Sequence, residues 1–121
     1  MPMFAFICRD GGDKSEARRT HLIEHLRYVE SIVDHMVVGG PCPPTAPFDL
    51  RQFEASLMVY KAETMSQARE LLENDPYYKN KIWDSVETLL FNPVAGTYIG
   101  GTTWDIVDGQ MIRKANAQTA E

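Results

Sequence analysis

The sequence is poor in several kinds of residue, and each shortage excludes a class of protein. Its two cysteines, Cys8 and Cys42, are too few for a disulfide framework or a cysteine zinc site, so we expect a reducing, cytoplasmic setting. The 17 acidic residues outnumber the 12 basic ones and no basic run occurs, which argues against nucleic-acid and anionic membrane partners. No apolar stretch approaches the roughly 18 residues of a membrane span. The apolar N-terminus lacks a charged leader, so we expect no signal peptide.

What remains is the composition of a small globular protein. With 121 residues, of which 44% are hydrophobic, the chain is long enough for one packed domain. A domain of this size gains stability from oligomerising, because association buries further apolar surface. We therefore expect a homodimer.

Apolar patterning predicts a β-α-β-β-α-β order. Strands are expected over 3–8, 35–38, 53–62 and 82–91, and helices over 13–33 and 64–74. Asp13 with Glu16, and Thr64 with Gln67, have capping-box spacing and are expected to begin the two helices. The order is that of the ferredoxin-like split βαβ fold, an α+β fold with both helices on one face of an antiparallel sheet. No third long helix is predicted to cover the other face of the sheet, so we expect the sheet of a partner subunit to cover it.

The connections are predicted from glycine and proline. Gly39-Gly40-Pro41 is expected to stop the second strand, and residues 42–52, with three prolines, are expected to form an irregular loop. Around Gly100-Gly101, the apolar residues between 97 and 107 predict an appended strand or hairpin. We therefore divide the chain into a ferredoxin-like domain over 1–95 and a C-terminal extension over 96–121. This extension, with its polar tail, would pack on the same domain or on the partner subunit.

Two polar residues fall at positions suited to chemistry. Pro76 ends the second helix and moves Asp75 out of helical geometry, which fixes a carboxylate at the helix end. His25 lies on the edge of an apolar stripe in the first helix, formed by Leu22, Leu26, Val29 and Val33. His25 is either a core histidine bonded to a backbone carbonyl or a general acid/base, since imidazole titrates at about pH 6.5. Asp75 is either a turn former or the carboxylate that orients that imidazole.

Other candidate residues have competing explanations. His21 and His25 belong to an H-x-x-E-H pattern, which is that of inverted zinc peptidases. The downstream sequence offers no recognisable third ligand and the chain is too short for a peptidase cleft, so we predict no metal and no cofactor. Ser56, in the middle of the third strand, is either a small packing residue or a hydroxyl facing the same cavity as His25.

Taken in order, the motifs resemble those of the YCII (YciI-like) family. The matching pieces lie between residue 3 and about residue 91 and are Cys8-Arg9-Asp10, Arg18, His25-Leu26-Arg27-Tyr28, Gly40-Pro41, Ser56-Leu57-Met58-Val59 and Asp75-Pro76-Tyr77. The chain departs from the family pattern at Leu22, where an arginine is frequent, and at Lys81-Ile82, where a Gly-Leu step is frequent. The extension from residue 96 has no counterpart in short members of the family.

The resemblance implies a fold and a type of chemistry. Members of the family pair into dimeric α+β barrels, and the positions of His25 and Asp75 are those of a proposed active-site pair. The family includes a dehydrochlorinase acting on a chlorinated hydroxyhydroquinone, and fold relatives include muconolactone isomerase. The resemblance thus implies a cofactor-independent lyase or isomerase for a small ring compound, and its serine carries over to Ser56. We expect Ser56 and Arg18 to contact a polar group of the substrate, while Tyr77 is either a wall of the substrate pocket or ordinary core. The alternative is a non-catalytic small-molecule binding or accessory protein of the same fold.

Overall fold

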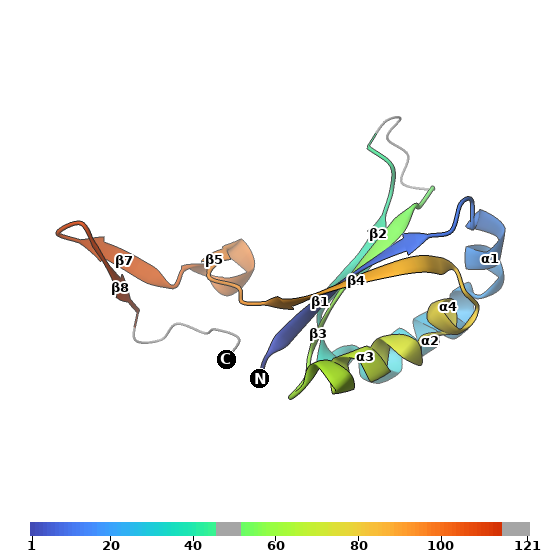
Figure 1. Ribbon diagram of the computed structural model, residues 1–121, viewed down its shortest axis with the longest axis horizontal. Helices are drawn as coiled ribbons and strands as arrows, with labels where there is room; N and C mark the ends of the chain where they lie inside the picture. The colour runs from blue at the N-terminus through green and yellow to red at the C-terminus, as the bar shows by residue number, and fades with distance from the viewer. Residues whose placement is uncertain (46–51, 115–121) are drawn as a thin grey trace.

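A computed structural model describes residues 1–45 and 52–114 of the chain. Its main domain contains β1 (Met3–Asp10), α1 (Ser15–Thr20), α2 (Leu22–Ile32), η1 (Val33–His35), β2 (Met36–Cys42), β3 (Ala55–Lys61), α3 (Met65–Glu73), α4 (Pro76–Lys79) and β4 (Trp83–Phe91). The four strands form one antiparallel sheet in the order β2-β3-β1-β4. All the helices lie on one face of this sheet (Figure 1). The ferredoxin-like α+β prediction is therefore confirmed.

The C-terminal segment forms short elements of its own. They are β5 (Ala95–Gly96), η2 (Thr97–Ile99), β6 (Gly101–Thr102), β7 (Trp104–Val107) and β8 (Gln110–Arg113). Strands β5 and β6 pair with each other, as do β7 and β8, so the appended element is two small hairpins. In Figure 1 the β7–β8 hairpin lies well away from the four-stranded sheet. The end of the tail, residues 115–121, lies outside the described residues.

The first predicted helix is divided in two. Helices α1 and α2 meet at His21, whose φ of −103° and ψ of 13° are not helical. The expected capping box at Asp13 is wrong, because the Asp13 carboxylate accepts from the backbone and hydroxyl of Ser15 at 3.0 and 2.7 Å. This local turn competes with the cap, and the helix begins at Ser15. At Thr64 the cap does form, and its hydroxyl accepts from the Gln67 N–H at 3.1 Å.

Strand β2 runs through the residues that were expected to stop it. Gly39, Gly40 and Pro41 pair with Met58, Leu57 and Ser56 of β3. The prediction of a stop is wrong because β2 is an edge strand, where a proline without an N–H group leaves no ladder bond unmade. Of the predicted loop over 42–52, Cys42 belongs to β2, and residues 46–51 lie outside the described residues.

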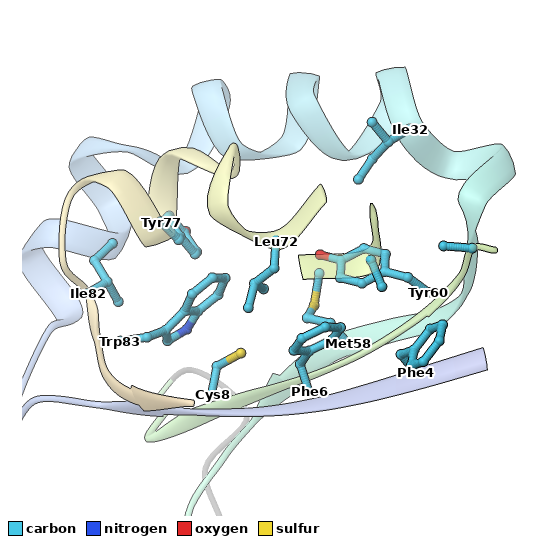
Figure 2. Packing of buried hydrophobic residues seen from close by; sticks show 12 residues of the cluster. Phe4, Phe6, Cys8, Ile32, Met58, Tyr60, Leu72, Tyr77, Ile82 and Trp83 are labelled. Atoms are coloured by element: carbon cyan, nitrogen blue, oxygen red, sulfur yellow. The ribbon is translucent and has the colours of Figure 1, made fainter. Parts of the chain in front are cut away.

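Large side chains fill the space between the sheet and the helices. Figure 2 shows this cluster, whose fully buried members include Phe6, Tyr60, Leu72 and Ile82. Alternate residues of β1 point toward the helices, and the Phe6 ring packs against the Tyr60 ring at a centroid distance of 5.6 Å. The predicted stripe of α2 is not part of this cluster, since Leu22, Leu26 and Val33 are 40%, 43% and 56% exposed. The end of α2 instead contributes Ile32 to the core.

None of the helices that the structure describes combines the length and the apolar character needed to cross a membrane.

Candidate functional site

A pocket of about 210 Å³ lies between α2 and the β2–β3 side of the sheet. It is bounded by Arg18, Leu22, His25, Leu26, Val29, Met36, Gly39, Gly40, Pro41, Phe53, Ser56, Met58 and Tyr77. Most of these residues are apolar, and the polar side chains belong to Arg18, His25, Ser56 and Tyr77. A mainly apolar pocket with a few polar groups is the usual form of a small-molecule site. The half-exposed stripe of α2 supplies its wall through Leu22 and Leu26.

The imidazole of His25 and the carboxylate of Asp75 are in direct contact. Nδ1 of His25 lies 2.7 Å from Oδ1 of Asp75, although the two residues are 50 positions apart. The His25 side chain is 14% exposed and the Asp75 side chain is completely buried. Within the described residues, Nε2 of His25 has no hydrogen-bond partner. The pair therefore leaves one imidazole nitrogen available on the pocket side.

The backbone fixes Asp75 in this position. Asp75 is the N-cap of α4, with a φ of −67° and a ψ of 131°, and Pro76 follows as the first helical residue. Its Oδ1 also accepts from the Tyr77 N–H at 2.8 Å. The Tyr77 ring stacks on the His25 ring, with centroids 3.9 Å apart and an interplanar angle of 3°. The Asp-Pro-Tyr sequence thus caps a short helix, positions a carboxylate and supplies a surface for the imidazole.

One oxygen of this carboxylate lacks a partner. Oδ2 of Asp75 is buried, and it makes no hydrogen bond to the described residues. A buried carboxylate with an unsatisfied oxygen lowers stability, and such costs are typical of functional sites. Burial, and next the charge of Asp75, raise the pKa of Cys8 to about 12, so its thiol stays protonated. Burial and the same charge also raise the pKa of Tyr60, so both groups are neutral neighbours of Asp75.

A buried arginine forms the second polar part of the site. Nε and Nη2 of Arg18 each donate to an oxygen of Asp10 at 2.7 Å, and Nη2 also donates to Ser56 Oγ at 3.2 Å. The guanidinium lies 5.4 Å from the Tyr77 ring centroid and 5.5 Å from that of Phe53. Nη1 has no partner among the described residues. A planar guanidinium held in this way presents its remaining N–H groups in a fixed direction.

The structure brings all five expected site residues together. His25, Ser56, Arg18 and Tyr77 line one pocket, and Asp75 lies behind His25. Sequence reasoning missed Asp10 and Phe53 as site residues. Asp10 could have been found from the charge of Arg18, since an arginine facing the core needs a carboxylate partner. Phe53 carried no such signal, because it was expected to begin the third strand, and an aromatic residue in a strand usually packs in the core.

His21 has a separate environment. Its Nδ1 lies 3.2 Å from Glu24 Oε1, and this pair is largely exposed. Across residues 1–45 and 52–114, no three His, Cys, Asp or Glu side chains are grouped closely enough to hold a metal ion. The H-x-x-E-H spacing therefore does not assemble a metal-binding cluster in this part of the chain.

A solved structure with a TM-score above 0.5 shares this architecture. Among solved structures, 5-chloro-2-hydroxyhydroquinone dehydrochlorinase from Burkholderia phenoliruptrix, in complex with 2,5-dihydroxybenzoquinone, is similar with a TM-score of 0.69 and 21% identity, over 79% of this chain and 97% of that one. Protein Atu4242 from Agrobacterium tumefaciens has a TM-score of 0.49 and 10% identity, over 78% and 94% of the two chains. No curated protein matches the sequence. The YCII-related domain matches residues 3–92, and the chain belongs to this family.

Proposed function

We propose that the protein is a cofactor-independent enzyme, a lyase or an isomerase, that moves a proton on a small ring compound. The observation that carries this proposal is the 2.7 Å contact between His25 Nδ1 and Asp75, which leaves Nε2 free beside an apolar pocket. Asp75 accepts the proton of Nδ1, so the lone pair of His25 is on Nε2. This is the tautomer that a general base requires.

The proposed reaction begins when Nε2 removes a proton from a ring carbon or hydroxyl of the substrate. The imidazole becomes cationic, and the buried carboxylate of Asp75 stabilises that charge in surroundings of low dielectric. The electrons of the broken bond move to a ring oxygen, and Nη1 of Arg18 and the hydroxyl of Ser56 are placed to donate to it. From this intermediate, His25 returns the proton to a different ring carbon, which gives an isomer. Where that carbon carries chlorine it becomes tetrahedral. Removal of a ring hydroxyl proton by His25 then expels chloride as a new double bond forms, which gives a quinone, chloride and a proton that His25 releases to solvent.

The size and lining of the pocket support a small, flat substrate. A volume of about 210 Å³ is below the usual range for drug-sized ligands, which begins at about 300 Å³. The similar dehydrochlorinase acts on 5-chloro-2-hydroxyhydroquinone, and its complex contains a dihydroxybenzoquinone. Substituted hydroxyquinones and hydroquinones are therefore the first compounds to test.

The test combines a binding measurement with two chemical readouts. The protein is incubated in D₂O with 5-chloro-2-hydroxyhydroquinone and with unchlorinated hydroxyquinones. We expect deuterium incorporation into a ring position by NMR, or chloride release by ion chromatography, above the rate in buffer. Binding of these compounds without exchange or chloride release would contradict an enzymatic role and favour the non-catalytic binding protein.

We also propose that the functional unit is a homodimer formed through the free face of the sheet. Residues on this face alternate with the core residues and include Ile7, paired with Leu57, and Leu89, paired with Ala5. Leu57 and Leu89 lie on the two strands that flank β1 and are 41% and 50% exposed, so both sides of this face present apolar surface. The β7–β8 hairpin, which lies away from the four-stranded sheet (Figure 1), is proposed to pack on the partner subunit.

Replacing Leu57 with glutamate should therefore produce monomers in sedimentation velocity experiments. A charge at this position would have to be buried without a partner in the dimer, at a cost of several kcal/mol. The matched control is Ile23→Glu, because Ile23 is also a large exposed residue but lies on α2. A natural protein that sediments as a monomer at micromolar concentration would refute the dimer.

A further inference from the structure

The helix-facing side of β2 carries almost no side-chain volume at the pocket. Gly39 pairs with Met58 and Pro41 pairs with Ser56, so these four residues face the same side of the sheet. The φ angle of Gly39 is not in the left-handed region, so its backbone does not require glycine. Gly39 matters because it leaves space on the helix-facing side of β2. This observation is independent of the polar groups on which the proposed function rests.

The space above Gly39 is covered by the ends of two methionine side chains. A methyl group placed on Gly39 would lie 2.6 Å from Met36 Cε and 3.2 Å from Met58 Sδ. Such contacts are too close, so one or both thioethers would have to move. Met58 is buried within the core (Figure 2), and Met36 is packed against that core. Because the core restricts other movements, the displaced methionine ends would enter the pocket.

The pocket therefore has a polar end and an apolar end. Ser56, which accepts from Arg18, and Met58, which lies beside Gly39, are two residues apart on β3. Two residues of a strand span about 6.6 Å, which is close to the width of a substituted six-membered ring. A ring whose oxygen reaches Arg18 thus directs its opposite side toward Met36, Gly39 and Met58.

We propose that Gly39 is a specificity-determining residue and that the substrate ring carries a compact apolar substituent opposite the oxygen held by Arg18. Methyl groups and halogens are the substituents that fit, because methionine sulfur is polarisable and its side chain adapts to irregular shapes. This inference rests on the proposed function, since it assumes that a ring compound occupies the pocket. It adds the position and type of a substituent, which the polar groups do not determine.

The test compares two probes, 2-hydroxy-1,4-benzoquinone and its 5-methyl derivative, by isothermal titration calorimetry. The 5-methyl group lies opposite the 2-hydroxyl oxygen. The natural protein should bind the methylated probe at least as tightly as the parent. In Gly39→Ala the affinity for the methylated probe should fall about tenfold, or about 1.4 kcal/mol, while that for the parent changes less than threefold. Ile23→Ala is the control, because Ile23 is exposed on α2 and does not bound the pocket, and both affinities should stay within twofold.

A second variant protects the test against misfolding of Gly39→Ala. Met36→Ala removes one of the covering side chains, and it should shift the preference toward the methylated probe. Equal losses for both probes in Gly39→Ala, or an unchanged preference in Met36→Ala, would overturn the role of Gly39. Failure of the natural protein to bind either probe would instead refute the proposed ring substrate. The two failures are therefore distinguishable.

Discussion

Replacing His25 with alanine should lower turnover of a ring substrate by about 10²–10⁴-fold, which is the usual contribution of a positioned general base. Among the described residues that line the pocket, His25 is the only one whose side chain offers a nitrogen base. Arg18 cannot replace it, because a guanidinium remains protonated and this one is held by Asp10. The measurement is kcat for deuterium exchange or chloride release, together with the dissociation constant of a hydroxyquinone.

The affinity should change much less than kcat, because in the proposed binding mode Arg18 and Ser56 hold the ring oxygens. The matched control is His21→Ala, which removes the histidine four residues earlier, at the junction of α1 and α2. His21 contacts the exposed Glu24 and does not line the pocket, so this variant should keep full activity. Full turnover by His25→Ala would exclude the imidazole as the base. Loss of ligand binding in parallel with turnover would indicate a packing role through the Tyr77 ring.

Much of the fold was predictable because turn-forming residues mark the ends of its helices and strands. Pro76 cannot continue α3, so the residue before it, Asp75, lies at a helix end in both the prediction and the structure. The strands were recognisable from apolar residues bounded by turn residues. The errors in the predicted bounds of helices and strands have a common physical cause. They occur where the local sequence allows two conformations and contacts with neighbouring segments determine which one forms. The edge position of β2, which carries it through Gly39-Gly40-Pro41, is set by pairing and not by local sequence.

The site was predictable in its residues but not in its shape. The contact between His25 and Asp75 joins positions 50 residues apart, and only the family resemblance indicated which histidine and which carboxylate belong together. The ion pair of Arg18 with Asp10 links a strand end to a short helix that was expected to be part of a longer one. The stripe of α2 looked like core, yet Leu22 and Leu26 are half exposed and form the pocket wall. Helical periodicity identifies an apolar face, but it does not reveal whether that face is packed or open.

The second large effect is expected from Asp75→Asn, which should lower kcat by about 10²–10⁴-fold and leave the KM within threefold. Asparagine has nearly the same size and can still accept the Tyr77 N–H through its carbonyl oxygen, so α4 keeps its cap. Both contacts of the natural carboxylate use Oδ1, so the same asparagine carbonyl also accepts the Nδ1 proton of His25 and the tautomer is kept. Even with the correct tautomer, the cationic imidazole would lose its carboxylate.

If Asp75 only supported the fold, Asp75→Asn would lower stability strongly and leave the turnover of each folded molecule normal. We expect only a small loss of stability. The natural carboxylate is completely buried and its Oδ2 has no partner among the described residues, so the neutral amide relieves a desolvation cost. The free energy of unfolding from urea titration should therefore fall by no more than about 1 kcal/mol, the typical value of an N-cap. Glu24→Gln, which alters the exposed carboxylate beside His21, is the matched control and should change neither kcat nor the free energy of unfolding.

The double variant Asp75→Asn with His25→Ala should lose no more activity than His25→Ala alone, because two residues that act as a unit do not contribute additively. An additive loss, or a large fall in stability with normal turnover per folded molecule, would show that Asp75 supports the fold and not the base.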